Sequence, residues 1–517
     1  MDDLKIYARN EEALSNMVKA THLFSDDIGM SFGIEKCAKL TIKRGKQVQA
    51  ENITISKEQT IKDLDQEETY KYLGVKESGG ISHNEMKKTI KQEYYRRLRK
   101  VLGTELNSKN KISAVNTLAV PVVAYSFNII NWTIPEIKRL DTKTRKLLTI
   151  NRMHHPKADV ERIYLPRPQR GRGMIKLENA YKIATIGLST YLTNAQEWTM
   201  KSVHQHDKVK KLYSIDKQAK KFMNELQLYQ ENDEELRTAV EKAKIIKINA
   251  KTSLQKAATT SWEEKPLHGQ FVKRTTQPNV SKKKTYQWLQ SAGLKAETEG
   301  LLIAAQDQSL PTKNYKTHIS KVEQDDLCRI CKNQKETIDH LISGCTIIAP
   351  TEYLERHNKI ARYLHWNICK EAEVEVCTKW YEHIPQPVTE TKEKTILWDF
   401  SIHTDRTIKA NRPDLIIKDK RTKKCLLVDV AVPADKNVTI KEFEKRSKYK
   451  DLEIEIQRMW KMETEVLPVV IGALGVVTKD LKMNLSKLPG EIREKEMQKI
   501  ALMGTAHILR KILSIKY

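Results

Sequence analysis

The sequence predicts an α+β protein built from several domains. Its 517 residues are enough for three or four domains, and 39% of them are hydrophobic, enough to form packed cores. Helical patterns dominate from residue 84 to residue 260, whereas beyond Pro385 the pattern becomes strand, strand, long helix and strand. Three of the seven cysteines cluster in one short segment, which indicates a metal site rather than a disulfide framework.

The first part of the chain mixes strand and helix patterns. We expect a short strand at Lys5–Ala8, an amphipathic helix at Asn10–Phe24 and a second strand at Ala38–Ile42. Residues 84–135 have polar and apolar positions at helical spacing, so helices are expected there. Residues 133–190 continue mostly helical, interrupted by prolines and glycines.

The middle of the chain is basic and polar. The loop Arg167–Gly173 is basic and expected to be flexible; it can grip a phosphate backbone, although a plain surface loop is the commoner meaning of such a run. Residues 200–260 contain little Gly or Pro and predict long exposed helices, which we interpret as a linker. Residues 265–285 predict a loop, and a helical stretch to Ile384 follows the cysteine cluster.

The charge balance favours a polyanionic partner. A formal net charge of +26 and a pI of about 9.5 point most simply to nucleic acid, although a solvated lysine-rich surface is the alternative. The acidic start Met1-Asp2-Asp3 is unlike a signal peptide. The longest apolar run, Val466–Val477, is too short to span a bilayer and predicts a buried strand. We therefore expect a soluble protein of the cytosol or nucleus.

The sharpest local spacing is Cys328-x2-Cys331-x8-His340-x4-Cys345. A Cys-x2-Cys turn can aim two thiolates at one ion, and the following His and Cys complete a tetrahedral Zn²⁺ shell. Four protein ligands predict a structural zinc site that organises a segment too small to fold by itself. The alternative is three ordinary cysteines and a surface histidine. We assign the remaining nearby candidates to the core or surface: His357, His365, Cys369 and Cys377.

A second constellation follows in the C-terminal quarter. Two apolar strands flank a polar turn, and a hairpin centred on Arg421 and Thr422 would make Asp414 and Asp429 cross-strand partners. Two carboxylates so close together repel each other unless a cation lies between them. Mg²⁺, which prefers oxygen ligands, can remove this repulsion. Such an ion activates water for phosphodiester hydrolysis. The expected strands are Leu415–Ile417 and Cys425–Ala431.

A long helix is expected at Thr439–Thr464, before a closing strand at Val466–Val477. Lys445 and Lys448 lie on its stripe facing the sheet, where a lysine can orient the attacking water or neutralise developing charge. The alternative is that these carboxylates and lysines simply face solvent, as most do.

These residues resemble a known family. Pro413-Asp414-x14-Asp429-x-Ala431 resembles the PD-(D/E)xK nuclease core, and more narrowly the restriction-like endonuclease of site-specific non-LTR retrotransposon polyproteins. In that family a helix lysine replaces the usual sheet lysine, and Ala431 stands here where the general pattern has lysine. The resemblance implies that Lys448 is the catalytic lysine, with Lys445 as second choice. The cysteine cluster is similar to the CCHC zinc knuckle that precedes the nuclease in these polyproteins.

The resemblance extends to the start of the chain. Met1-Asp2-Asp3-Leu4 resembles the catalytic Asp-Asp motif of a reverse transcriptase, with Asp2 and Asp3 as a polymerase remnant. Gly33–Cys37 is similar to the lysine motif that follows it, and Tyr70–Gly74 resembles the primer-grip hairpin. The helices to about residue 190 would be the thumb. A polymerase palm also needs an earlier carboxylate, so we expect a truncated polyprotein without DNA polymerisation of its own.

The resemblance implies a DNA endonuclease that uses Mg²⁺, with a structural Zn²⁺ nearby, and DNA target and element RNA as partners. In an intact parent, nicking of target DNA would prime reverse transcription. The alternative is a non-catalytic nucleic-acid-binding protein from a decayed or co-opted element. The expected parts are a partial reverse transcriptase palm (1–80), a thumb-like helical region (81–190), a basic helical linker (191–320), a CCHC zinc knuckle region (321–370), an α/β PD-(D/E)xK-like nuclease (385–490) and a C-terminal helix (491–517).

Overall fold

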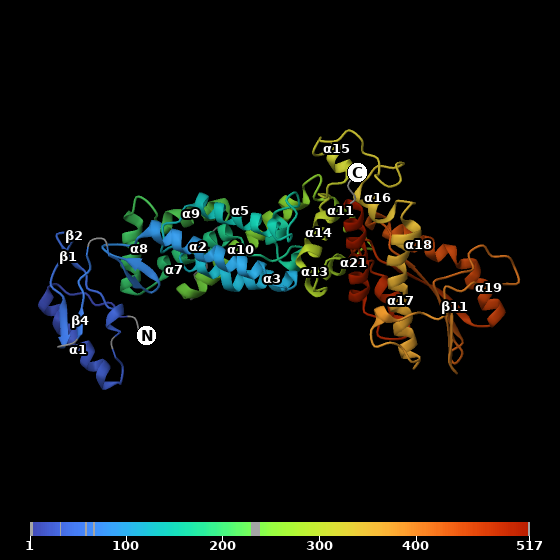
Figure 1. Cartoon of the computed structure of the whole chain (residues 1–517), viewed down its shortest axis with the longest axis horizontal. Helices are drawn as coiled ribbons and strands as arrows, with labels where there is room; N and C mark the ends of the chain where they lie inside the picture. Colours follow the sequence, from blue (N-terminus) through green and yellow to red (C-terminus); the bar gives the residue numbers. More distant parts are fainter. Residues whose placement is uncertain (1–3, 32, 57–58, 66–67, 229–237, 515–517) are drawn as a thin grey trace.

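The computed structural model describes residues 4–31, 33–56, 59–65, 68–228 and 238–514. The molecule is elongated, with a small N-terminal part, a helical arm and a larger C-terminal body that contains the main sheet (Figure 1). The described residues form an α+β structure, mostly helical, with one five-stranded mixed sheet and three small hairpins. Within these residues, no helix combines the length and the apolar character needed to cross a membrane.

The N-terminal part is one helix packed on short hairpins. Helix α1 begins after Asn10, whose side chain accepts a hydrogen bond from the Ala13 amide and so caps the first turn. The expected strand at Lys5–Ala8 is wrong, because these residues form no regular structure. The second expected strand appears slightly later, as β1. The elements are α1 (Glu11–Asp27), β1 (Thr41–Lys43), β2 (Lys46–Val48), β3 (Ile53–Ser56) and β4 (Gln59–Ile61).

A separate hairpin connects this part to the arm. Strand β5 (Tyr70–Tyr72) pairs antiparallel with β6 (Val75–Glu77) through the two-residue turn Leu73-Gly74. Both turn residues have positive φ, 47° and 80°, which is the backbone geometry of a type I′ hairpin turn. The hairpin expected at Tyr70–Gly74 is therefore confirmed as a structure.

The arm is a bundle of helices around one apolar core. Helix α10 packs along α7, and its Ile246 and Ala250 are buried there, so the expectation that this helix lies exposed is wrong. The helices of the arm are α2 (His83–Leu102), α3 (Ser108–Ala114), α4 (Val120–Ala124), α5 (Ile134–Ile150), α6 (Glu161–Tyr164), α7 (Leu177–Asn194), α8 (Trp198–Val209), α9 (Ile215–Glu225) and α10 (Ala239–Glu263).

The basic loop Arg167–Gly173 is used internally. The guanidinium of Arg172 is buried and donates to Glu299 at 2.8 Å, and Arg167 donates to the same carboxylate at 2.9 Å. The Ser108 hydroxyl also donates to Glu299. For these two buried arginines, the plain surface loop and the phosphate-gripping loop are therefore both wrong. Both guanidinium groups are paired with this one carboxylate inside the protein, where the loop joins α3 to the C-terminal body.

The segment predicted as a loop at 265–285 contains two short helices, with Phe271 fully buried, so that prediction is wrong. This segment and the helices after it lead from the arm into the body. They are α11 (Gln270–Arg274), α12 (Lys282–Thr285), α13 (Trp288–Ser291), α14 (Ala296–Gln306), α15 (Lys313–His318), α16 (Ile338–Ser343) and α17 (Leu354–Glu371).

The C-terminal sheet has the strand order β11-β10-β9-β8-β7. Strands β7 to β10 pair antiparallel in sequence order, and the α18–α19 crossover returns the chain to place β11 parallel to β10. The strands are β7 (Val388–Glu390), β8 (Lys394–Trp398), β9 (Leu415–Asp419), β10 (Lys424–Ala431) and β11 (Glu463–Val470), and the helices are α18 (Val438–Lys448), α19 (Lys450–Trp460), α20 (Leu481–Ser486) and α21 (Glu494–Leu513).

Both faces of this sheet are covered, because successive side chains of a strand point to opposite sides. Ile416 and Leu427 pack in one cluster with Leu452 of α19, on the face that α18 and α19 cross. Leu415 and Val428 pack in another, under α17, α20 and α21.

Two sequence expectations need correction here. The long helix expected at Thr439–Thr464 is two helices, separated at Tyr449, whose backbone leaves the helical region. The strand expected at Val466–Val477 ends at Val470, because a tight turn around Gly472 follows. Strands β7 and β8 were not predicted. The expected C-terminal helix is confirmed as α21.

Candidate metal centre and candidate nuclease site

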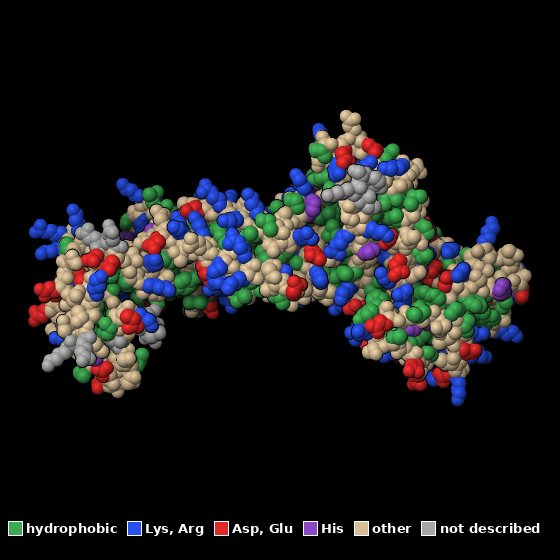
Figure 2. Space-filling model, in the orientation of Figure 1, with side chains coloured by type: hydrophobic (Ala, Val, Ile, Leu, Met, Phe, Trp, Pro, Cys, Tyr) green, Lys and Arg blue, Asp and Glu red, His purple; other side chains and the backbone are tan. Residues whose placement is uncertain are grey.

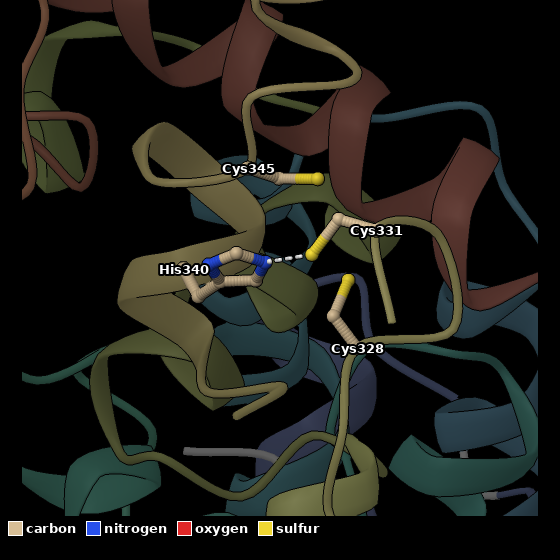
Figure 3. A group of neighbouring side chains, drawn as sticks. All are labelled: Cys328, Cys331, His340 and Cys345. Atoms are coloured by element: carbon tan, nitrogen blue, oxygen red, sulfur yellow. Dashed lines mark hydrogen bonds between the residues drawn. The ribbon is translucent and has the colours of Figure 1, made fainter. Parts of the chain in front are cut away.

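The four predicted zinc ligands converge. The ligand atoms of Cys328, Cys331, His340 and Cys345 all lie within 4.8 Å of one another, and their side chains point to a common centre (Figure 3). His340 comes from α16, and the two first cysteines come from the turn before it. The distance from Cys331 Sγ to His340 Nε2 is 3.4 Å. A tetrahedral zinc shell would separate such an N and S by about 3.6 Å, so the cluster can bind zinc.

The surroundings of this cluster orient its ligands. The Nδ1 atom of His340 lies 3.1 Å from the Gln334 side-chain oxygen, which leaves Nε2 facing the sulfurs. Burial raises the pKa of the Cys328 thiol to about 11. Burial acts in the same direction on Cys331, but the amides of Asn333 and Gln334 outweigh it and lower its pKa. Cys331 therefore ionises more readily than Cys328.

The hairpin that carries the two aspartates has the predicted register. Residues of β9 and β10 pair as Leu415 with Val428 and Ile416 with Leu427, and one further step along this register sets Asp414 opposite Asp429. An Asp414 oxygen accepts a hydrogen bond of 2.6 Å from the amide of Val430. Both carboxylates therefore lie at the same end of the same strand pair.

One ammonium group serves this pair directly. Lys445 of α18 forms an ion pair with Asp429. The Tyr449 hydroxyl lies 2.9 Å from the other oxygen of Asp429 and 3.0 Å from the Arg412 carbonyl. Lys448 donates to that hydroxyl at 2.8 Å and so reaches Asp429 only through it. The geometry brings the second-choice lysine, Lys445, against the carboxylate and places Lys448 one contact away.

A histidine from α17 completes the site. His357 Nε2 lies 2.9 Å from an Asp414 oxygen. Burial acts to lower the pKa of His357, but the hydrogen bond and the charge of Asp414 outweigh it and raise that pKa. Burial acts to raise the pKa of Asp414, yet its contact with His357 lowers it. Burial and then the negative charge of Asp414 raise the pKa of Asp429.

The site is partly open. Asp429 is almost fully buried, with 3% of its side chain exposed, whereas Asp414 and Lys445 are each about one-fifth exposed, at 20% and 21%. A ligand can therefore reach one carboxylate and the ammonium group from solvent. This combination of an acidic pair and a cation can bind a divalent ion or hold a phosphate group.

Sequence reasoning missed three features. His357 and Tyr449 contact the aspartates across long sequence separations, which no local spacing reveals. His365, Cys369 and His383 form a second buried cluster of metal-binding side chains, whereas His365 and Cys369 were interpreted as core or surface residues. Burial lowers the pKa of His365 to about 4 and raises that of Cys369 to about 11.

Asp2 and Asp3, the expected polymerase remnant, lie outside the described residues.

The chain was compared with known proteins. No protein-family model matches it, and no curated protein is significantly similar to it. The resemblance drawn from its motifs therefore stays a prediction, and the contacts at the two sites support or weaken it.

Proposed function

We propose that residues 385–490 form a metal-dependent DNA endonuclease module of the restriction-like type found in non-LTR retrotransposon polyproteins. The observation that carries the proposal is the β9–β10 register, which sets Asp414, the residue before β9, opposite Asp429 of β10, with the Lys445 ammonium group against Asp429. Carboxylates that simply faced solvent would lack these contacts: Lys445 and the Tyr449 hydroxyl contact Asp429, and His357 contacts Asp414.

The donor set fits a magnesium ion shared with substrate. Within the described ranges, the two groups of three or more metal-binding side chains leave out Asp414 and Asp429. Two carboxylates are nevertheless sufficient, because Mg²⁺ commonly takes one or two protein carboxylates, with waters and substrate phosphate oxygens completing its shell. When bound, the ion would activate water and stabilise the charge of the phosphodiester transition state.

The protein's own groups have separate tasks in this proposal. Asp414 and Asp429 hold the cation, and His357 keeps the Asp414 carboxylate in place by its hydrogen bond. Lys445 neutralises negative charge that develops on the phosphate, since its ammonium group lies at the carboxylates and is partly exposed. Tyr449 fixes Asp429, and Lys448 supports Tyr449.

A nicking assay tests the proposal. Supercoiled plasmid is incubated with the full chain and Mg²⁺, with and without a chelator. We expect the wild-type chain to convert plasmid to the open circle, and Asp414→Asn to abolish this while DNA binding and the circular dichroism spectrum stay unchanged. Asp451→Asn, on the exposed face of α19, is the matched control and should cut normally.

One observation favours the alternative of a non-catalytic nucleic-acid-binding protein. A groove of about 760 Å³ is formed by residues between 168 and 290, none of which belongs to the aspartate site. Its lining includes the cationic side chains of Arg170, Lys256, Lys282 and Lys283. Lys and Arg side chains are also spread along the visible face of the arm (Figure 2). These features serve element RNA or DNA binding whether or not the chain cuts. If wild type and Asp414→Asn both bind DNA and neither nicks it, the non-catalytic function holds.

A further inference from the structure

A second group of soft donors lies in the C-terminal body, apart from the Cys3His cluster and from the paired aspartates. His365 and Cys369 are one helical turn apart on α17, and i and i+4 side chains share one face of a helix. His383 follows the short 3-10 turn Trp380–Glu382. Their ligand atoms lie within 4.8 Å of one another, and their exposed fractions are 1%, 1% and 8%.

From this geometry we propose that His365, Cys369 and His383 bind a second zinc ion, which clamps the C-terminal half of α17 to the loop that leads into the sheet. The proposal does not depend on the nuclease function. Two imidazoles and a thiolate are ligands that zinc prefers, and three protein ligands leave one position of a tetrahedral shell for a small fourth ligand such as water.

The distances are close to those of a zinc shell. His365 Nδ1 lies 3.5 Å from Cys369 Sγ, and a tetrahedral shell would place such a pair about 3.6 Å apart. His365 Nδ1 lies 2.8 Å from His383 Nε2, where the shell requires about 3.3 Å. Binding therefore requires a separation of the two rings by about half an ångström and a rotation of the Cys369 side chain, whose sulfur also lies 3.8 Å from His365 Nε2.

The alternative is a plain hydrogen bond between two neutral histidines. That bond explains the contact between the two rings, which are stacked with centroids 5.0 Å apart. It does not involve the thiol of Cys369, which comes from the same helix face and lies 3.5 Å and 3.8 Å from the two ring nitrogens of His365. The ring of Trp398 packs edge-on against that of His365, with ring centroids 5.6 Å apart, so an aromatic ring borders the cluster. A metal ion gives all three donors one partner.

Metal analysis of the purified full chain tests the proposal. We expect two zinc ions per wild-type chain and one per Cys369→Ser chain. Cys425→Ser is the matched control. Cys425 is also fully buried, but it lies in strand β10 and belongs to neither of the two groups of metal-binding side chains. It should keep both ions. Cys331→Ser should lose only the ion of the Cys3His cluster, and the double variant should lose both.

X-ray absorption at the zinc edge keeps the test valid if Cys369→Ser fails to fold. The Cys3His cluster alone supplies three sulfurs and one nitrogen, whereas the two sites together average two sulfurs and one and a half nitrogens per zinc. An average of two sulfur neighbours per zinc in the wild-type chain supports the proposal. One zinc per chain with three sulfur neighbours, or two zinc ions retained by a folded Cys369→Ser variant, would overturn it.

Discussion

Replacing Glu299 by glutamine should destabilise the junction between the arm and the C-terminal body far more than a surface substitution does. The Glu299 carboxylate is fully buried and accepts hydrogen bonds from Arg167, Arg172 and Ser108. Burial lowers the pKa of Arg172, yet this guanidinium has the carboxylate as its direct counter-charge. Glutamine keeps the shape but removes the negative charge and turns a donor toward two guanidinium groups.

The cost follows from leaving buried charges uncompensated. Removing one partner of a buried ion pair costs about 3–5 kcal/mol, and here one carboxylate serves two arginines, so we expect about 4 kcal/mol. In a cooperative unit of 150–250 residues that corresponds to a fall in Tm of roughly 8–16 °C.

Thermal unfolding followed by circular dichroism measures this effect. Glu297→Gln, two residues earlier in α14 and exposed, is the control and should shift Tm by less than about 2 °C. If Glu299→Gln unfolds at the same temperature as Glu297→Gln, or if it weakens DNA binding without any change in Tm, the internal role assigned to the basic loop is wrong.

Three further predictions concern other positions. Lys445→Met should reduce plasmid nicking about 100-fold or more, and Lys448→Met clearly less, because Lys445 contacts Asp429 directly and Lys448 reaches it through Tyr449. Equal losses of nicking activity in the two variants would contradict this ranking. Gly300→Ala should lower the free energy of unfolding in urea by about 1–3 kcal/mol, since a Cβ there would lie 2.4 Å from the backbone oxygen of Met153. An unchanged midpoint of the urea transition would show that the helix moves away from this oxygen without cost. Burial raises the pKa of Asp141 to about 6, against the pull of two backbone amides. A carboxyl group whose folded pKa exceeds its unfolded value gains stability as pH falls, so the unfolding free energy of wild type relative to Asp141→Asn should rise by about 1.4 kcal/mol from pH 7 to pH 5; a constant difference between those pH values refutes this assignment.

The candidate sites differ in how much of them the sequence could predict. The Cys3His spacing and the register of the aspartate hairpin are local patterns, and both were predicted correctly because a short turn fixes which residues meet. The contact of His357 with Asp414 joins elements 57 residues apart and leaves no local signal. Periodicity likewise could not place the interruption at Tyr449, since the apolar stripe continues across it.

The same limit explains two of the errors in the middle of the chain. The composition of α10 is polar and lysine-rich, which is typical of an exposed helix, yet a few small and apolar side chains are enough to bury one face against α7. The loop at 167–173 has the charge of a phosphate-binding loop. Its partner Glu299 lies more than 120 residues away, so only the folded chain reveals that Arg167 and Arg172 are already paired with a carboxylate.

Helix α21 also determines when the C-terminal body can fold. Its first half packs in the core under the sheet, through Met497 and Ala501, and its second half packs in the core around the cysteine cluster, through Leu509. The Gln498 amide donates to the carbonyls of Lys284 and Gly475. Both cores stay incomplete until α21 has left the ribosome. We therefore expect this body to fold only once α21 is available, and slowly, because contacts such as that of Gln498 with Lys284 close loops of roughly 200 residues.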